Sequence, residues 1–411
     1  MRRRRFLRAI AGTGSIGAFG MAGAACGAGE EDVRVIPTTV PETRAGTTRY
    51  GPLSEDPDAN DLLLPEGFTS KLLAVGGETV PGTTYEWHPF PDGGACFATD
   101  DGGWIYANNS EVYIEGEGGA SSLRFDADGV VVDAYRILDG TTMNCAGGAT
   151  PWGTWLSCEE IADGRVWECD PVGRREAVVR PAMGAFRHEA VAADESRRVL
   201  YMSEDERDGV LYRFTPDRWG DLSQGDLAAL VVDDDGTTRW EPLEGTGAEG
   251  PATRYRVPAA RNFPGGEGLA LDNDLLYLST KGDTRTPVGT SGDGRVYRLA
   301  LGGGELTTYW KGPPLKGPDN LAVHPATGNL FACEDGGDME VVVITPDGHA
   351  DPFLRFVGHG GSEVTGAAFD PSGTRLIVNS QRAPTERTIQ DVIGAGGDMS
   401  LGRTYMITGS F

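Results

Sequence analysis

Six short runs of β-forming residues, each ending in polar or acidic side chains, recur along the chain after about residue 100. Their starts are separated by roughly 45 to 75 residues, with turn-forming segments such as Asp370–Gly373 between strands. Glycine supplies 61 of the 411 residues, which leaves little room for long helices. Six units of a few strands each are typical of propellers. The sequence therefore predicts an all-β fold, a six-bladed β-propeller. The six runs are 104–108, 154–159, 199–204, 275–280, 330–334 and 376–380.

A second pattern, an acidic residue followed by a small apolar strand, precedes most of these runs. Glu189 precedes Glu204 by 15 residues, and Asp319 precedes Glu334 by the same distance. An antiparallel neighbour returns its end to the edge at which the first strand begins. If the first strands line the channel, both sets of acids lie at one mouth of it. The spacing predicts a ring of carboxylates around the axis, with the thiol of Cys145 among them.

Ionised carboxylates that converge in this way repel one another unless a cation lies between them. Oxygen ligands suit calcium, whereas a thiolate suits iron. We therefore predict mixed metal binding with Cys145 as the softer ligand. The alternative is that these acids are solvated turn residues, but their recurrence at matched positions favours the metal site. Lysine is too scarce to supply the counter-charge, because the chain has only Lys71, Lys281, Lys311 and Lys316.

The first 26 residues have the pattern of an export signal. Residues 2–8 (Arg-Arg-Arg-Arg-Phe-Leu-Arg) precede a weakly apolar, Gly- and Ala-rich stretch, and paired arginines indicate the twin-arginine pathway. Cys26 follows a Gly-Ala-Ala sequence, so lipid anchoring there is an alternative to a free periplasmic or secreted protein. Residues 27–60 are predicted to be an acidic lead-in and 61–411 a single propeller. No stretch is long and apolar enough for a transmembrane span.

Five cysteines remain when Cys26 is set aside, so at least one thiol is free or bound to another group. Cys158 and Cys169 are close enough in sequence to form a disulfide, and Cys96 and Cys333 could also pair. Packing thiols are an equally good interpretation. The formal net charge of −25 makes nucleic-acid binding unlikely to be the function, because it would repel phosphate backbones.

The segment 144–160 (NCAGGATPWGTWLSCEE) strongly resembles the signature of PhoX-type alkaline phosphatases. Further matches are Phe186–Glu189, Tyr201–Glu206 and Glu363–Gly366. The resemblance extends from about residue 60 to the C-terminus. It implies a six-bladed propeller, exported by the twin-arginine machinery, that hydrolyses phosphate monoesters with ferric iron and calcium.

By position, the resemblance makes Cys145 the iron ligand and assigns the other metal ligands to acidic residues. Three of these assignments are open between two neighbours in the sequence. The candidates are Glu159 or Glu160, Glu189, Glu204 or Asp205, Glu267, Asp319, and Glu334 or Asp335.

The leading hypothesis is thus an exported, metal-dependent phosphatase for small phosphate monoesters, with diesters as further substrates and a monomer as the expected state. Arg187, Lys281 and Arg382 are the candidate catalytic residues, because a cation stabilises charge that develops on phosphate. One alternative is a calcium-dependent propeller hydrolase of lactones or organophosphates. Another is a non-catalytic, calcium-stabilised propeller that presents a binding face.

Overall fold

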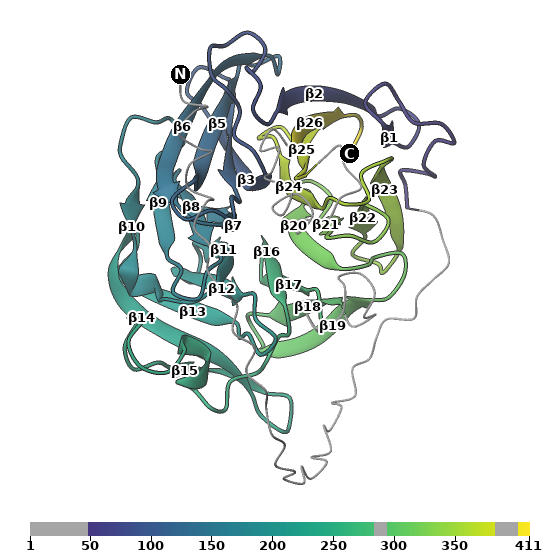
Figure 1. Ribbon diagram of the computed structural model, residues 1–411. Coiled ribbons are helices and arrows are strands. Elements are labelled where there is room, and N and C mark those ends of the chain that lie inside the picture. Colours follow the sequence, from purple (N-terminus) through teal and green to yellow (C-terminus); the bar gives the residue numbers. More distant parts are fainter. Residues whose placement is uncertain (1–47, 283–293, 383–401) are drawn as a thin grey trace, which may run out of the picture. The chain divides into compact units, whose positions relative to one another are not determined.

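All six predicted runs form the second strand of an antiparallel sheet. The computed structural model describes residues 48–282, 294–382 and 402–411, whose strands form six sheets of four or five strands each. We number these sheets blades one to six, in the order in which their first strands occur along the chain. The predicted six-bladed β-propeller is confirmed (Figure 1).

The strands are distributed among the blades as follows. Blade one contains β3 (Pro91–Ala98), β4 (Trp104–Ser110), β5 (Gly118–Phe125) and β6 (Val131–Thr141). Blade two contains β7 (Asn144–Ala149), β8 (Trp155–Glu159), β9 (Val166–Cys169) and β10 (Val178–Val179). Blade three contains β11 (His188–Asp194), β12 (Val199–Glu204), β13 (Tyr212–Arg218), β14 (Asp221–Val232) and β15 (Thr238–Pro242).

Blade four contains β16 (Gly266–Asp272), β17 (Leu275–Thr280), β18 (Arg295–Ala300) and β19 (Glu305–Lys311). Blade five contains β20 (Pro318–Val323), β21 (Leu330–Glu334), β22 (Glu340–Ile344), β23 (Ala350–Phe356) and the short β1 (Leu62–Leu63). Blade six contains β24 (Val364–Phe369), β25 (Arg375–Ser380), β26 (Arg403–Thr408) and β2 (Thr69–Val75). The 3-10 helices among the described residues are η1 (Pro181–Met183) and η2 (Thr253–Tyr255).

The first strands of the blades form the inner wall of the ring. β3 contacts β7, and the contacts continue through β11, β16, β20 and β24 back to β3. Blade six is built from both ends of the described chain, because β2 pairs antiparallel with β26. This pairing closes the ring of blades.

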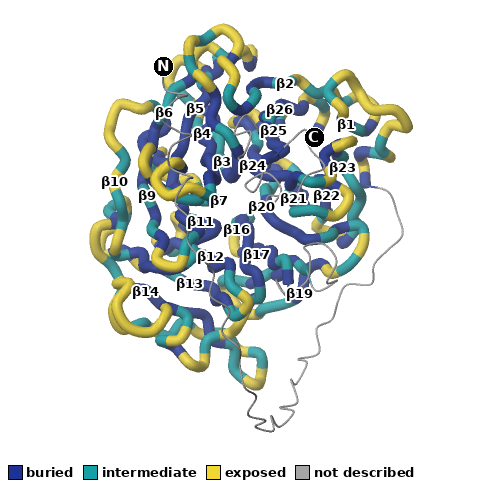
Figure 2. The backbone as a smooth tube through the Cα atoms, in the orientation of Figure 1, coloured by how far each residue is buried: buried dark blue, intermediate teal, exposed yellow. Residues whose placement is uncertain are grey.

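Apolar side chains fill the space between neighbouring blades. β22, with the sequence Glu-Val-Val-Val-Ile, is buried along its whole length, and β-branched residues suit such a pleated, buried surface. Its Val341 and Val343 belong to a core cluster with Val378 and Ile407 of blade six. Each fully buried side chain of this kind contributes about 1.5–3 kcal/mol. Figure 2 shows that buried residues follow the strands and that exposed residues lie on the outer connections.

Each first strand has a register shift near its start. The shifts lie between Pro91 and Gly94, Asn144 and Gly147, His188 and Val191, Gly266 and Leu269, Pro318 and Leu321, and Thr365 and Ala368. A bulge of this kind interrupts the ladder and re-aims a side chain. The six shifts therefore mark one level of the propeller at which side chains can be turned toward the axis.

Gly366 lies at this level, and replacing it by alanine is expected to destabilise the protein by about 2–5 kcal/mol. Its φ of +65° disfavours a side chain, and an added Cβ would lie 2.4 Å from the carbonyl oxygen of Asp92 in blade one. Thermal or urea unfolding checks this. Gly358→Ala is the control, because Gly358 has a φ of +77° but no atom within 4 Å of the added Cβ. An equal loss in both variants would contradict the expected clash.

The predicted export signal, 1–26, lies outside the described residues, as do Cys26 and residues 27–47 of the predicted lead-in. Within residues 48–60, Tyr50 is buried in the core cluster of Phe331 and Phe353. The five described cysteines carry free thiols, so neither disulfide considered from the sequence forms. In the part of the chain that is described, no helix combines the length and apolarity needed to cross a membrane.

Candidate metal centre

An inner ring of ligand side chains lies at the level of the register shifts. In blades one to five, the residue directly after the first paired position is Asp or Glu or the single cysteine of the ring. In blade six this position is Thr365, and Glu363, just before β24, supplies the carboxylate instead. We call these residues the inner ring: Asp92, Cys145, Glu189, Glu267, Asp319 and Glu363. All six are buried.

A second ring follows the ends of the second strands. The residue immediately after each of β4, β8, β12, β17, β21 and β25 occupies an equivalent place, since the last residue of each of these strands pairs with the start of a first strand. Four of the six are carboxylates, one is a lysine and one an amide. This outer ring consists of Glu111, Glu160, Asp205, Lys281, Asp335 and Gln381.

The two rings together hold four overlapping sets of potential ligands. Within each set, one ligand atom from each residue lies within 4.8 Å of the others. Consecutive sets share a residue, so the donors form one continuous cluster rather than isolated groups. The sets are Asp92, Glu111 and Cys145; Cys145, Glu160 and Glu189; Glu189, Glu267 and Asp319; and Asp319, Asp335 and Glu363.

Several of these carboxylate oxygens are buried without a hydrogen-bond partner. Both oxygens of Glu189 are in this condition, as is Oδ1 of Asp92, and the Glu189 residue is 0% exposed. Burial raises the pKa of Glu189 well above its usual range, and neighbouring Glu267 adds to the effect. Buried charges in proteins are normally paired or bound to metal. The unpartnered oxygens and the adjacent thiol therefore fit metal ions as the missing partners.

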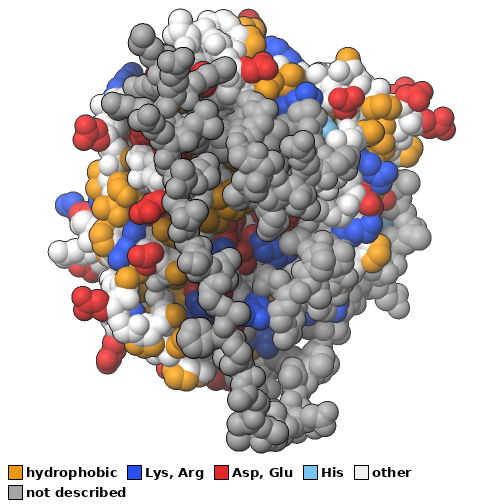
Figure 3. Space-filling model, in the orientation of Figure 1, with side chains coloured by type: hydrophobic (Ala, Val, Ile, Leu, Met, Phe, Trp, Pro, Cys, Tyr) orange, Lys and Arg blue, Asp and Glu red, His pale blue; other side chains and the backbone are white. Residues whose placement is uncertain are grey.

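The three predicted catalytic residues all contact this cluster. Arg187 forms an ion pair with Glu160, and Arg382 donates from Nη1 to Oε1 of Glu363 at 2.8 Å. Lys281 is bound by two carboxylates at once. Figure 3 shows basic and acidic side chains next to one another near the centre of this face.

Three of the predicted ligands lie outside the cluster. Glu159 accepts a hydrogen bond from Nε1 of Trp167, Glu204 from the hydroxyl of Tyr212, and Glu334 from the backbone N–H of Lys316. Each is the last residue of its second strand, and successive side chains of a strand point to opposite faces. Of each pair left open by the sequence, the neighbours Glu160 and Asp335 lie in the close sets, while Asp205 lies beside them and pairs with Lys281.

His188, next to Glu189, is also directed away from the ring. It is buried, its Nε2 lies 3.4 Å from the carbonyl oxygen of Gly184, and burial lowers its pKa to about 3. It is therefore a neutral packing residue.

Sequence reasoning missed Asp92, Glu111 and Glu363 as members of the cluster. Glu363 opens one of the acid-plus-strand patterns, so its signal was present in the sequence. Asp92 and Glu111 are 19 residues apart, because β4 and β3 are longer than their counterparts. The interval of about 15 residues seen in other blades therefore did not reveal them.

Hydrogen bonds between blades fix the backbone of the inner ring. Asn109 donates to the carbonyl oxygen of Cys145 at 3.0 Å, and Asn379 donates to that of Asp92 at 2.9 Å. Ser203 and Ser279 donate in the same way to the carbonyl oxygens of Glu267 and Asp319, respectively. Each donor comes from a second strand and reaches the first strand of the next blade. The ligands are thus held by neighbouring blades as well as by their own.

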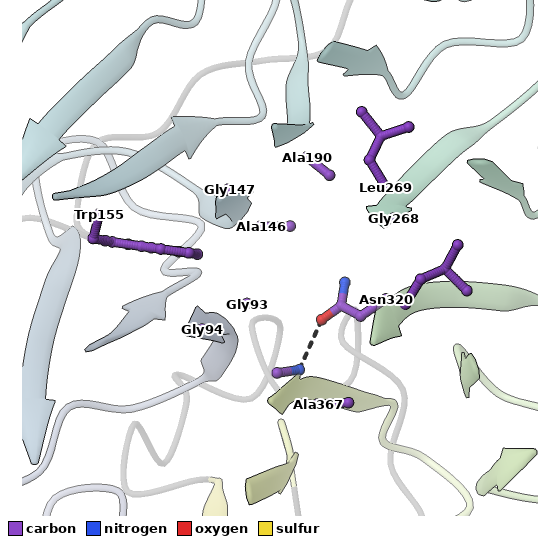
Figure 4. A pocket seen from close by; sticks show the side chains of 12 residues that line it. Gly93, Gly94, Ala146, Gly147, Trp155, Ala190, Gly268, Leu269, Asn320 and Ala367 are labelled. Atoms are coloured by element: carbon purple, nitrogen blue, oxygen red, sulfur yellow. Dashed lines mark hydrogen bonds between the residues drawn. The ribbon is translucent and has the colours of Figure 1, made fainter. Parts of the chain in front are cut away.

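Below the inner ring, the channel narrows to a pocket of about 40 Å³ lined mainly by small residues (Figure 4). The side chain of Asn320 crosses it, accepting from the N–H of Gly366 at 2.7 Å and donating to Oδ1 of Asp319 at 2.8 Å. A space of this size holds water rather than a phosphate ester. A substrate therefore reaches the carboxylates from the other side, where Arg187 is one-third exposed.

Without bound metal, the stability of the protein is expected to fall as the pH rises from about 4 to about 7. Burial raises the pKa of Asp92 and that of Asp335 to about 7. A carboxyl whose pKa is higher in the folded than in the unfolded chain binds more protons when folded, so raising the pH favours unfolding. The melting temperature in chelator should be higher at pH 5 than at pH 8. The metal-loaded protein should show the opposite order, and a higher value at pH 8 in chelator would contradict the expectation.

Comparison with known proteins supports the resemblance seen in the sequence. Residues 98–167 and 162–270 match the family described as alkaline phosphatase PhoX. PhoX from Pseudomonas fluorescens, solved with vanadate, a transition state analogue, is 18% identical, with a TM-score of 0.67 over 88% of this chain and 98% of that one. A gluconolactonase from Xanthomonas campestris is 15% identical, with a TM-score of 0.44 over 85% and 89%. No curated protein matches the sequence. The family match, together with the shared propeller fold, places this chain in the PhoX alkaline phosphatase family.

Proposed function

We propose that this protein is an exported, metal-dependent phosphatase that hydrolyses small phosphate monoesters, and diesters as further substrates, at the mouth of the propeller channel. The observation that carries the proposal is the buried carboxylate of Glu189, which lacks any partner and shares a ligand set with the thiol of Cys145. An acidic cluster alone would repel a phosphate ester, so the proposal requires the cluster to hold cations.

The donor chemistry divides the centre into two parts. The sets that include Cys145 offer a thiolate with carboxylates and suit ferric iron. The sets around Asp319 contain oxygen donors only and suit calcium. Bound metal ions supply Lewis acidity and the positive charge that a phosphate ester needs.

The arginines are suited to bind the substrate. A guanidinium matches phosphate oxygens in a fork of two hydrogen bonds. Arg187 keeps a buried Nε without a partner, and Arg382 lies on the other side of the cluster, 7% exposed. We assign these two side chains to hold the ester and to stabilise the charge that develops on phosphate. Their carboxylate partners, Glu160 and Glu363, keep both guanidiniums oriented before substrate arrives.

Export follows from residues 1–26, whose paired arginines direct folded proteins to the twin-arginine machinery. A protein that acquires its metals before crossing the membrane needs such a route. We propose a periplasmic or secreted monomer, with attachment through a lipid on Cys26 as the alternative location.

Elemental analysis of the full chain, purified from a host with a twin-arginine pathway and without chelator, tests the proposal. We expect iron and calcium in stoichiometric amounts, hydrolysis of p-nitrophenyl phosphate and inhibition by vanadate. Calcium without iron, together with turnover of a lactone but not of the phosphate ester, would replace the proposal with the lactonase hypothesis. Metal without any turnover would favour a binding propeller, and no metal would refute the centre.

A further inference from the structure

Lys281 is the single cation in the outer ring. It follows the last residue of β17, as Glu111 follows β4, Glu160 follows β8 and Asp335 follows β21. The fold therefore places an ammonium group where other blades place a carboxylate. The question is what this reversal of charge does in a cluster that otherwise collects negative charge.

The ammonium group lies between carboxylates of two blades. Nζ of Lys281 is 2.7 Å from Oε1 of Glu267 and 3.0 Å from Oδ2 of Asp205, and the side chain is only 16% exposed. Although burial acts against it, the attraction of Asp205 and Glu267 raises the pKa of Lys281 well above its usual range. The side chain is thus a buried cation that binds two ligands of the ring at once.

The backbone holds the lysine in this place. The N–H of Lys281 donates to the carbonyl oxygen of Gly265 at 2.9 Å. Gly265 has a φ of +62°, and a Cβ there would lie 2.8 Å from Cγ of Lys281. The aliphatic part of the lysine therefore packs directly over a glycine, which leaves room for the ammonium group to reach the carboxylates.

The charge balance shows how much this one group matters. Nine carboxylates belong to the two rings, and three cationic side chains contact them. Arg187 and Arg382 contact outer carboxylates on either side, whereas Lys281 neutralises the sector of Asp205 and Glu267. Asp205 belongs to none of the four close ligand sets.

We propose that Lys281 is a built-in cation of the centre, whose ammonium group occupies the place of a divalent cation between Asp205 and Glu267. The proposal rests on the proposed function, because it assumes that the rest of the cluster holds metal. It follows that this sector binds no ion of its own and that the protein holds one ion fewer than a ring with a sixth oxygen ligand would hold. Lys281 is then a positioning residue that fixes Glu267, not a group that touches substrate.

The test is to count bound calcium in Lys281→Glu and Lys281→Gln. Both substitutions remove the ammonium group and add an oxygen that calcium accepts. We expect about one additional equivalent of calcium per chain relative to the unmodified protein, measured by elemental analysis after equilibrium dialysis against a fixed free calcium concentration. We also expect calcium to raise the melting temperature of the variants by more than it raises that of the unmodified protein.

Two controls isolate the effect. Lys281→Arg keeps the charge and should keep the original calcium count. Lys71→Glu changes the net charge equally on the exposed face of β2 and should also leave the count unchanged.

An unchanged calcium count in a folded Lys281→Gln or Lys281→Glu, beside metal in the unmodified protein, would overturn this proposal and leave the proposed function intact. Absence of metal from the unmodified protein would instead refute the proposed function. If Lys281→Glu fails to fold, Lys281→Gln decides the result, because it introduces no new charge.

Discussion

Replacing Cys145 by alanine is expected to remove iron from the protein and to lower phosphatase activity by more than about 100-fold. The thiol is the only sulfur in the four ligand sets, and it belongs to two of them. Loss of an outer partner of a metal ligand already costs about 10–100-fold, so loss of the ligand itself should cost more. Burial raises the pKa of Cys145 well above its usual range, and the nearby carboxylates add to this, so iron binding must displace the thiol proton.

Iron content, the thiolate-to-iron absorption band and the hydrolysis of p-nitrophenyl phosphate check this prediction together. Cys158→Ala is the matched control. Cys158 is equally buried and lies on β8 of the same blade, but it packs in the apolar core and in no ligand set. It should lose some stability and retain iron. Full activity with normal iron in Cys145→Ala would refute the assignment of the iron ligand.

Replacing Glu189 by glutamine is expected to have opposite effects on stability with and without metal. In chelator the variant should melt higher, because it removes a buried carboxylate whose two oxygens have no partner. In the metal-loaded state it should melt lower and lose activity, because Glu189 is shared by two ligand sets. A buried charge that loses its partner costs about 3–5 kcal/mol, which corresponds to a shift on the order of 5 °C or more.

Calorimetry in chelator and in metal-containing buffer measures both effects. Glu204→Gln serves as the comparison, since Glu204 is as buried as Glu189 but hydrogen-bonded to Tyr212 and to Arg254. That variant should melt lower in both buffers. A lower melting temperature of Glu189→Gln in chelator would show that the carboxylate has a partner other than metal.

The sequence was sufficient to predict the blades because the signal is local. A run such as Leu330–Glu334 is apolar, short and bounded by turn residues, and it forms a buried second strand as predicted. The outermost strands carry no such signal. β10 consists of Val178 and Val179 and is recognisable only by its pairing with β9.

Prediction of the centre was limited by the side of the strand to which each acid points. Glu159 and Glu160 are adjacent and chemically alike, and composition gives no reason to choose between them. The structure separates them, because the register of β7 with β8 fixes Glu159 in the blade, where it binds Trp167, and turns Glu160 to the cluster. Asp92 was missed because its ring position depends on a register shift, which local sequence does not encode.

The pairing of β2 with β26 has a consequence for biosynthesis. The seam of the ring lies beside the centre itself: Gln381 of blade six donates to Oε2 of Glu111 in blade one at 2.7 Å, and Asn379 donates to the backbone of Asp92. Until the ribosome has released β26, blade six lacks its third strand and β2 has no partner in it. A nascent chain therefore cannot complete the cluster, and metal insertion must follow translation. Premature termination before β26 would leave an open ring that should fail to retain its ions.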